Sequence, residues 1–215
     1  MAETYDFKMP LEEAMLTQRA IRRLTDDPVE DDLLRRLIEL ALKAPTGSNA
    51  QNWEWIVVRD PAVKARLARK NRQAWGIYGR IGRRIAQNDP KMQKVLDAVQ
   101  WQADHLDQSP VIVVACLKGV RLMFPPIAAA SYYGSIFPSV QNLLLAARAV
   151  GLGAALITLP LWSSLSARRI LGCPYSVTPC AVIPLGWPRG RYGPTTRRPV
   201  EEVVSVDSYG NRAWV

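Results

Sequence analysis

Histidine and cysteine are scarce in this 215-residue chain, which has one histidine and three cysteines. The single His105 leaves no Ser-His-Asp or Cys-His arrangement and no histidine-rich metal site to build. Cys116, Cys173 and Cys180 are too few and too scattered for a disulfide framework or a zinc site. Ordinary side-chain nucleophiles, bases and metal ligands are therefore poorly supplied for catalysis.

Long uninterrupted apolar runs are also missing. The N-terminal stretch is mixed and charged, without the apolar segment of a secretory signal. The longest mostly apolar stretch, 142–162, contains Arg148 and a glycine-containing turn, which argues against a membrane span. No G-x-G-x-x-G follows a strand and no phosphate-binding P-loop is present; the Gly-Leu-Gly at 151–153 reads as a helix cap. A cytoplasmic protein without a membrane partner is expected.

Acidic residues are outnumbered, with 19 Asp and Glu against 28 Lys and Arg, a net charge of +9 and a pI near 9.8. Such a surface can attract nucleic acid, anionic lipid or an anionic cofactor. The basic residues are spread along the chain, and no zinc-finger spacing or aromatic RNA-recognition pattern accompanies them. A nucleic-acid partner is therefore not expected.

Periodicity predicts short strands intermixed with helices, without regular βαβ alternation, which favours an α+β fold. The predicted helices cover 10–19, 26–44, 61–70, 127–151 and 164–172, and the predicted strands cover 53–60, 109–118, 154–160 and 178–188. Pro138 should kink or split the long helix. Glycines and Pro90 suggest that 71–107 forms broken helices, as an excursion from one domain of residues 1–215. The polar extension at about 196–215 should wrap over another surface.

Four stretches carry candidate site residues, and each can also be explained without a ligand. Arg19 and Arg22 are three apart and can share one face, either to cradle a phosphate or as the solvated end of a helix. The stretch 44–55 begins with hydroxyl and amide groups, at Thr46, Ser48, Asn49 and Gln51, that suit a heterocycle edge, or it is a loop that bonds only to itself.

The other two stretches are weaker when taken alone. Thr158 and Leu159 end a predicted strand, where backbone amides could face a ligand. Arg197 lies in the basic "TTRRPVEEV", which alone reads as surface charge.

In this order, the stretches "RAIRRLTDDPV", "APTGSNAQNWEWIVV", "SVQNLLLAARAVGLGAALITLP" and "IPLGWPRGRYGPTTRRPVEEVV" resemble the flavin-dependent nitroreductase family. The resemblance runs from about residue 11 to 204. It implies a three-layer α-β-α sandwich with a mostly antiparallel central sheet. It also implies an intertwined homodimer, with FMN at the subunit interface and the C-terminal segment reaching across the partner.

The same resemblance implies a set of FMN-binding residues: Arg19, Ala20, Arg22, Pro45, Thr46, Gly47, Asn49, Gln51, Thr158, Leu159 and Arg197. The family's N-terminal motif usually reads Arg-Arg-Ser-x-Arg, so Gln18 and Ala20 leave two side-chain donors missing. The 45–51 residues would approach FMN from the partner subunit. Thr158 and Leu159 would lie beside the isoalloxazine, and Arg197 would bind the phosphate with the N-terminal arginines.

The implied reaction is ping-pong hydride transfer from NADH or NADPH through FMN to nitroaromatics, quinones or similar flat acceptors, with no catalytic side chain required. The alternatives are a protein that sequesters FMN without turnover, flavin-consuming chemistry and reductive dehalogenation. Five aromatic residues could wall the acceptor pocket or belong to the core: Trp75, Tyr78, Trp101, Phe124 and Tyr133.

Overall fold

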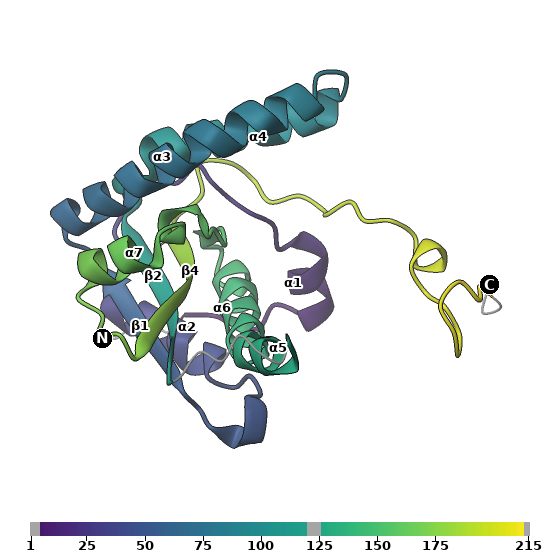
Figure 1. Cartoon of the computed structure of the whole chain (residues 1–215), viewed down its shortest axis with the longest axis horizontal. Coiled ribbons are helices and arrows are strands. Elements are labelled where there is room, and N and C mark those ends of the chain that lie inside the picture. The colour runs from purple at the N-terminus through teal and green to yellow at the C-terminus, as the bar shows by residue number, and fades with distance from the viewer. Residues whose placement is uncertain (1–4, 120–125, 213–215) are drawn as a thin grey trace.

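A four-stranded sheet runs through the centre of the protein, in a computed structural model that describes residues 5–119 and 126–212 (Figure 1). Its strands are β1 (Trp53–Val58), β2 (Val111–Lys118), β3 (Gly153–Ala154) and β4 (Val177–Gly186). They lie in the order β1-β2-β4-β3, and every neighbouring pair is antiparallel. The two central strands are almost entirely buried, which explains their continuous apolar sequences.

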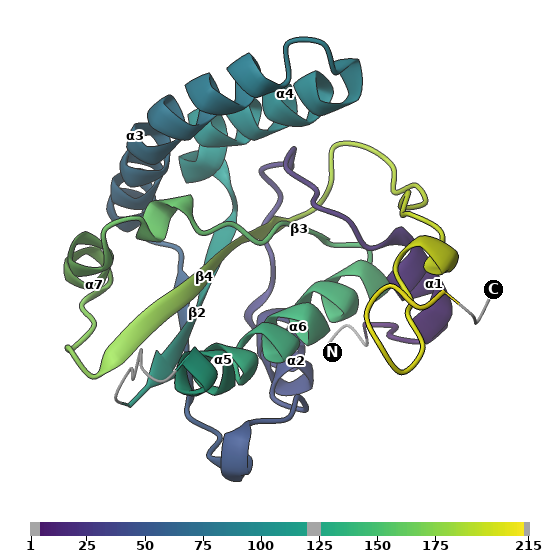
Figure 2. The ribbon, with the colours of Figure 1, turned by 45° about the vertical axis from the view of Figure 1, so that its right-hand side comes forward.

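Helices cover both faces of this sheet. Successive β2 side chains point to opposite faces: Val113 joins the core packed under α2 (Asp31–Ala41) and α6 (Phe137–Ala149). Ile112 joins the core on the other face, beneath α3 (Pro61–Ile85) and α7 (Ser164–Leu171). Figure 2 shows the resulting three layers, so the expected α-β-α sandwich is confirmed.

The expected broken helices across 71–107 are present with a single break, at 86–89 before Pro90, and the breaks expected at the glycines are absent. Helix α3 continues unbroken to Ile85, and α4 (Pro90–His105) returns beside it. A Cβ on Gly79 would lie 2.8 Å from the Trp75 ring, and one on Gly82 would lie 3.1 Å from Leu96. These glycines therefore permit close packing within a helical hairpin and do not interrupt α3.

The strand expected at 154–160 is also mostly absent, because β3 ends at Ala154. The next residue of β4 along the ladder is Pro184, which has no N–H to donate, so the pairing cannot continue regularly. Only an isolated bridge between Ile157 and Val182 follows, and then a 3-10 helix, η3 (Leu159–Leu161).

The long helix does divide into two, as expected, but the break lies at 135–136, just before Pro138. Helix α5 (Pro126–Gly134) ends before α6, and Pro138 lies in the first turn of α6, where a missing N–H costs little. Three further 3-10 helices are η1 (Gly47–Asn49), η2 (Leu106–Gln108) and η4 (Val200–Glu202).

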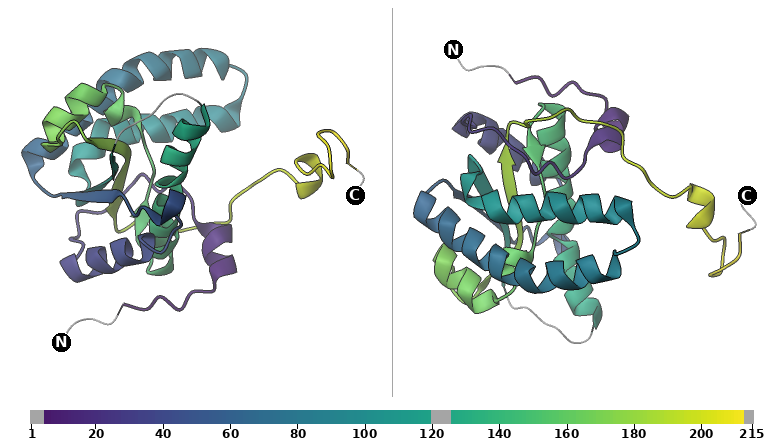
Figure 3. Two further views of the ribbon diagram at one scale, coloured as in Figure 1. Left: turned by 60° about the horizontal axis from the view of Figure 1, so that its bottom comes forward. Right: turned by 90° about the horizontal axis from the view of Figure 1, so that it is seen from above.

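The C-terminal tail projects from the body instead of covering it (Figures 1 and 3). Thr195 is fixed to α1 (Leu11–Thr17), since its N–H and its hydroxyl both donate to the Leu16 carbonyl. Beyond it, residues 197–203 are exposed throughout. Contact of this tail with a partner subunit stays a prediction.

Candidate anion-binding site and its relatives

The segment 18–25 is fixed against the end of the sheet by backbone hydrogen bonds. The Ile21 N–H donates to the Ala154 carbonyl at 3.0 Å, and the Thr25 N–H donates to the Trp187 carbonyl at 2.8 Å. In return, the Arg189 N–H donates to the Arg23 carbonyl at 3.0 Å. The arginines of this segment are thereby placed next to the residues that follow β4.

A cavity of about 620 Å³ opens where this segment, the chain after β4 and helix α4 meet. It is strongly cationic, and Asp97 is the one carboxylate that faces it among the residues that the structure describes. Its lining residues are Arg19, Ala20, Ile21, Arg22, Arg23, Lys94, Asp97, Ala98, Arg189, Gly190 and Arg191. The cavity therefore suits an anionic ligand.

Arg22 is partly buried, whereas the other arginines and the lysine that line the cavity are exposed. Burial lowers the pKa of its guanidinium, and the nearby charge of Arg19 lowers that pKa further. Its Nε is buried and has no hydrogen-bond partner among the described residues. A bound anion would satisfy this donor and relieve the repulsion between the two arginines.

The buried Arg22 donor, which has no partner in the part of the chain that the structure describes, and the surrounding arginines fit the anionic part of FMN. The phosphate of FMN carries nearly two negative charges at neutral pH, and several arginines from separate segments are the groups that would hold it. Arg19 and Arg22 come from one segment, and Arg189 and Arg191 from another, so the phosphate could be held from two sides.

The segment carrying Arg191 is anchored by Tyr192. The Tyr192 hydroxyl donates to the Leu152 carbonyl, and the Arg148 guanidinium lies 4.1 Å from the centre of the Tyr192 ring. Arg148 is itself fixed, because its Nε donates to the Thr17 hydroxyl at 2.8 Å. Burial raises the pKa of Tyr192 to about 12, so this hydroxyl keeps donating even in alkaline solution where an exposed tyrosine would ionise.

Thr158 and Leu159 lie at the start of η3, beyond the end of β3. Thr158 is exposed, and Leu159 packs against the small cluster between α3 and α4 that contains Trp75 and Leu96. Neither lines the cavity, so their place beside an isoalloxazine stays a prediction.

The stretch 45–51 lies at the other end of the sheet. Asn52 accepts from the N–H of Lys118 at the C-terminal end of β2, whereas the arginine segment lies near Pro110, which precedes β2. Eight residues of β2 separate these ends by roughly 24 Å. One chain therefore does not bring Asn49 and Arg22 together.

The structure supports both interpretations of this stretch, a loop that bonds to itself and a loop that binds a ligand. Gln51 bonds to its own loop: its amide donates to Asn49 Oδ1, and its N–H donates to the Thr46 hydroxyl, both at 3.1 Å. Yet Ser48, Asn49 and Gln51 all have φ near +50°, a left-handed conformation that non-glycine residues rarely adopt. Such strain is characteristic of ligand-binding loops. Pro45 and Gly47 are exposed beside them.

Arg197 does not line the cavity. It lies on the exposed tail, where its guanidinium donates to the Thr196 carbonyl. A contact with FMN phosphate, in its own chain or across a dimer, stays a prediction. Sequence reasoning missed Arg189, Arg191, Arg23 and Lys94 as cavity residues. The Arg-Gly-Arg at 189–191, which follows the apolar strand β4 after Trp187 and Pro188, was the available signal for two of them.

The aromatic residues proposed for an acceptor pocket lie in different environments. Trp75 is 7% exposed and belongs to the core of the α3–α4 hairpin, whereas Tyr78 is 52% exposed and meets Trp162 edge to face. Trp101 stacks on His105, with ring centres 4.3 Å apart. Tyr133 lies on α5, and Phe124 falls outside the described residues.

In residues 5–119 and 126–212, no helix is long and apolar enough to cross a membrane. The same residues contain no group of three or more histidine, cysteine or carboxylate side chains placed to hold a metal ion.

The chain is similar to known proteins along most of its length. The sequence model of the Nitroreductase family matches residues 15–187. An NADH dehydrogenase of Thermus thermophilus is 30% identical over 204 residues, which cover 89% of this chain and 93% of that protein. Iodotyrosine deiodinase 1 of Rattus norvegicus is 24% identical over 90% of this chain and 68% of its own length.

A similar solved structure is that of oxidised iodotyrosine deiodinase bound to FMN and 3-iodo-L-tyrosine. It superposes with a TM-score of 0.71 at 20% identity, covering 93% of this chain and all of the other. At this identity the likeness concerns the fold.

Proposed function

This chain belongs to the nitroreductase family of oxidoreductases, and from that premise we propose that it is an FMN-dependent enzyme using NADH or NADPH to reduce a flat aromatic or quinone-like acceptor. The observation that carries the proposal is the cationic cavity around Arg22, whose buried Nε lacks a partner among the described residues. Bound FMN would supply two-electron chemistry, which this histidine-poor chain does not provide by itself.

The residues of the chain would bind and orient the cofactor. Arg19 and Arg22, with Arg189 and Arg191, would hold its anionic groups in the cavity. Tyr192 would keep the second of these pairs in place through its bond to the Leu152 carbonyl. No described side chain is assigned a covalent step.

A homodimer would complete the site. The strained stretch 45–51 is too far from Arg22 to serve the same cofactor within one chain, so a second copy would supply it. The projecting tail supports the same arrangement, because Val200 and Val203 expose apolar surface that a partner could cover.

The experiment is anaerobic reduction of the purified, FMN-loaded protein. The protein is expected to be yellow and to lose its flavin absorbance on addition of NADH or NADPH. Yellow protein that neither nucleotide bleaches would instead indicate FMN storage, and protein that rejects added FMN would contradict the proposal altogether.

A second candidate, reductive dehalogenation, is favoured by the similarity to rat iodotyrosine deiodinase along most of this chain. Reduced protein should be offered a nitroaromatic, a quinone and 3-iodotyrosine in parallel. Release of iodide at a rate that exceeds nitro and quinone reduction would select the second candidate.

A further inference from the structure

Helix α4 presents two different faces. Leu96 and Ala103 point toward α3 and pack in the hairpin core. Lys94, Ala98 and Trp101 are spaced at i, i+4 and i+7, so they share the opposite face. Lys94 and Ala98 line the cavity, and Trp101 reaches the arginine segment, because the Arg23 guanidinium lies 5.5 Å from its ring centre.

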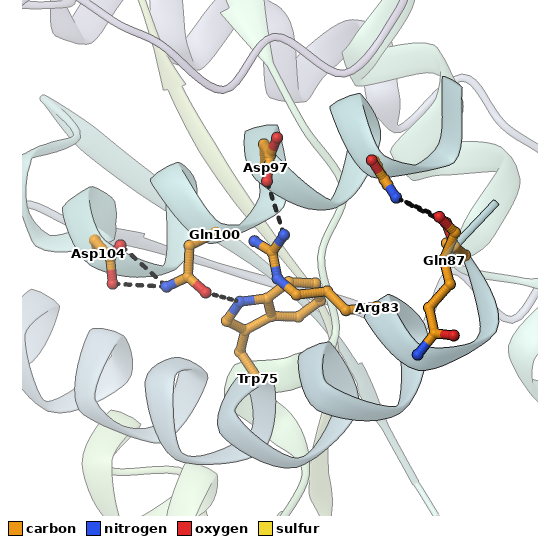
Figure 4. Close-up of polar contacts among 8 residues, drawn as sticks. Trp75, Arg83, Gln87, Asp97, Gln100 and Asp104 are labelled. Carbon is orange, nitrogen blue, oxygen red and sulfur yellow. Dashed lines mark hydrogen bonds and ion pairs between the residues drawn. The ribbon is translucent and has the colours of Figure 1, made fainter. Parts of the chain in front are cut away.

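This face is held rigidly. Figure 4 shows Gln100 of α4 between two partners: its oxygen accepts from the Trp75 indole of α3 at 2.8 Å, and its amide donates to Asp104 at 3.0 Å. Arg83 of α3 pairs with Asp97 at 2.8 Å (Figure 4). Lys94 is therefore carried on a helix whose position is fixed by polar bonds as well as by apolar packing.

The positive charge of the side chains that line the cavity exceeds the negative charge of one FMN phosphate. Six cationic side chains line it, and its one carboxylate, Asp97, is already neutralised by Arg83. Arg189 has Asp26 at 3.8 Å, but Arg19, Arg22, Arg23, Arg191 and Lys94 have no acidic partner within 4.0 Å among the residues that the structure describes. An FMN phosphate of about −2 would leave roughly three of these charges unmatched.

The unmatched charges are divided between two places. Arg19, Arg22 and Arg191 belong to the sheet side of the cavity, whereas Lys94 is on α4 and Arg23 turns toward Trp101 of α4. Between Lys94 and Trp101 lies the small side chain of Ala98, which leaves room along this face.

We infer that Lys94 and Arg23 form a second anion subsite, which selects substrates that carry a phosphate or a carboxylate. The inference rests on the proposed function, because the substrate that this subsite binds is either the nicotinamide donor or the electron acceptor of the FMN-dependent reaction. The anionic group can come from either source: the 2′-phosphate that distinguishes NADPH from NADH, or a carboxylate on the acceptor.

The test compares matched pairs on the FMN-loaded protein. For donors, dissociation constants of NADP+ and NAD+ are measured by calorimetry, and rate constants of flavin bleaching are measured with NADPH and NADH. For acceptors, kcat/KM is measured with 4-nitrobenzoate and with uncharged 4-nitrobenzyl alcohol. The variants are Lys94→Gln and Lys94→Glu, with Arg69→Gln of α3 as the control, because that exposed arginine does not line the cavity.

The unmodified protein should favour the anionic member of at least one pair, and Lys94→Gln should lower that selectivity ratio about tenfold. Lys94→Glu should lower it further, and Arg69→Gln should leave it unchanged. A response of the donor pair alone identifies the phosphate as the source, and a response of the acceptor pair alone identifies the carboxylate.

If neither ratio moves in the Lys94 variants, or if Arg69→Gln moves them equally, the subsite does not exist. Failure of the proposed function looks different, because then no nicotinamide bleaches the flavin of the unmodified protein.

Discussion

Replacing Arg22 with methionine should lower the affinity for FMN about 10- to 100-fold, because one or two charge-assisted hydrogen bonds are lost. The apo-protein should be as stable as before or more stable. Burial and Arg19 both lower the Arg22 pKa, so in protein without FMN this guanidinium is a charge that folding disfavours. Methionine keeps the apolar stem and removes that charge.

Quenching of FMN fluorescence during titration gives the affinity, and thermal unfolding of the apo-protein gives the stability. Arg35→Met is the matched control, since Arg35 is exposed on α2 and does not line the cavity. An Arg22→Met protein that is destabilised but binds FMN normally would make Arg22 a structural residue.

Replacing Gly153 with alanine should destabilise the protein by about 1–3 kcal/mol and also weaken FMN binding. A Cβ there would lie 2.7 Å from Ile21 Cγ2 and 2.8 Å from Leu24 Cδ2, so the arginine segment must shift away from β3. The same substitution at Gly76 should stabilise the protein by about 0.5–1 kcal/mol, because a Cβ there would meet no described atom within 4 Å beyond its chain neighbours and helix backbone, and alanine is the better helix former.

Urea unfolding of both variants, together with FMN titration, measures these effects. Opposite signs from one chemical change would establish close packing at Gly153 as the cause. Equal destabilisation by both substitutions, or a Gly153→Ala protein with unchanged FMN affinity, would contradict this account of how the arginines are positioned.

Local patterns were sufficient for much of the fold. The apolar runs of β2 and β4 and the start of a helix at residue 61 could be assigned from sequence. The Asp60 carboxylate caps that helix, because it accepts from the N–H groups of Ala62 and Val63. The glycines of α3 were misread for two reasons: Leu96, the partner of Gly82, comes from α4, and local sequence does not show that the Trp75 side chain lies over Gly79. The short β3 depends on Pro184 of a distant strand.

In the candidate site, too, features within one segment could be predicted from sequence, whereas features that depend on contacts between distant segments could not. The spacing of Arg19 and Arg22 and the family resemblance predicted their proximity, because both residues belong to one segment. Lys94 could not be found this way, since its place at the cavity depends on how α4 returns along α3. The placement of Asn49 far from Arg22 required the register of the whole sheet.

The central claim is that each flavin site combines the arginine segment of one chain with the 45–51 loop of another. It is tested by heterodimers in which one chain carries Arg22→Met and the other carries Asn49→Ala, purified through two different affinity tags. Each variant homodimer should lose tight FMN binding.

In the heterodimer, one site receives both substitutions and the other receives neither. FMN titration should therefore find one site per heterodimer with the affinity of the unmodified protein. If both sites of the heterodimer bind as weakly as those of the variant homodimers, each flavin is held within a single chain and the claim is contradicted.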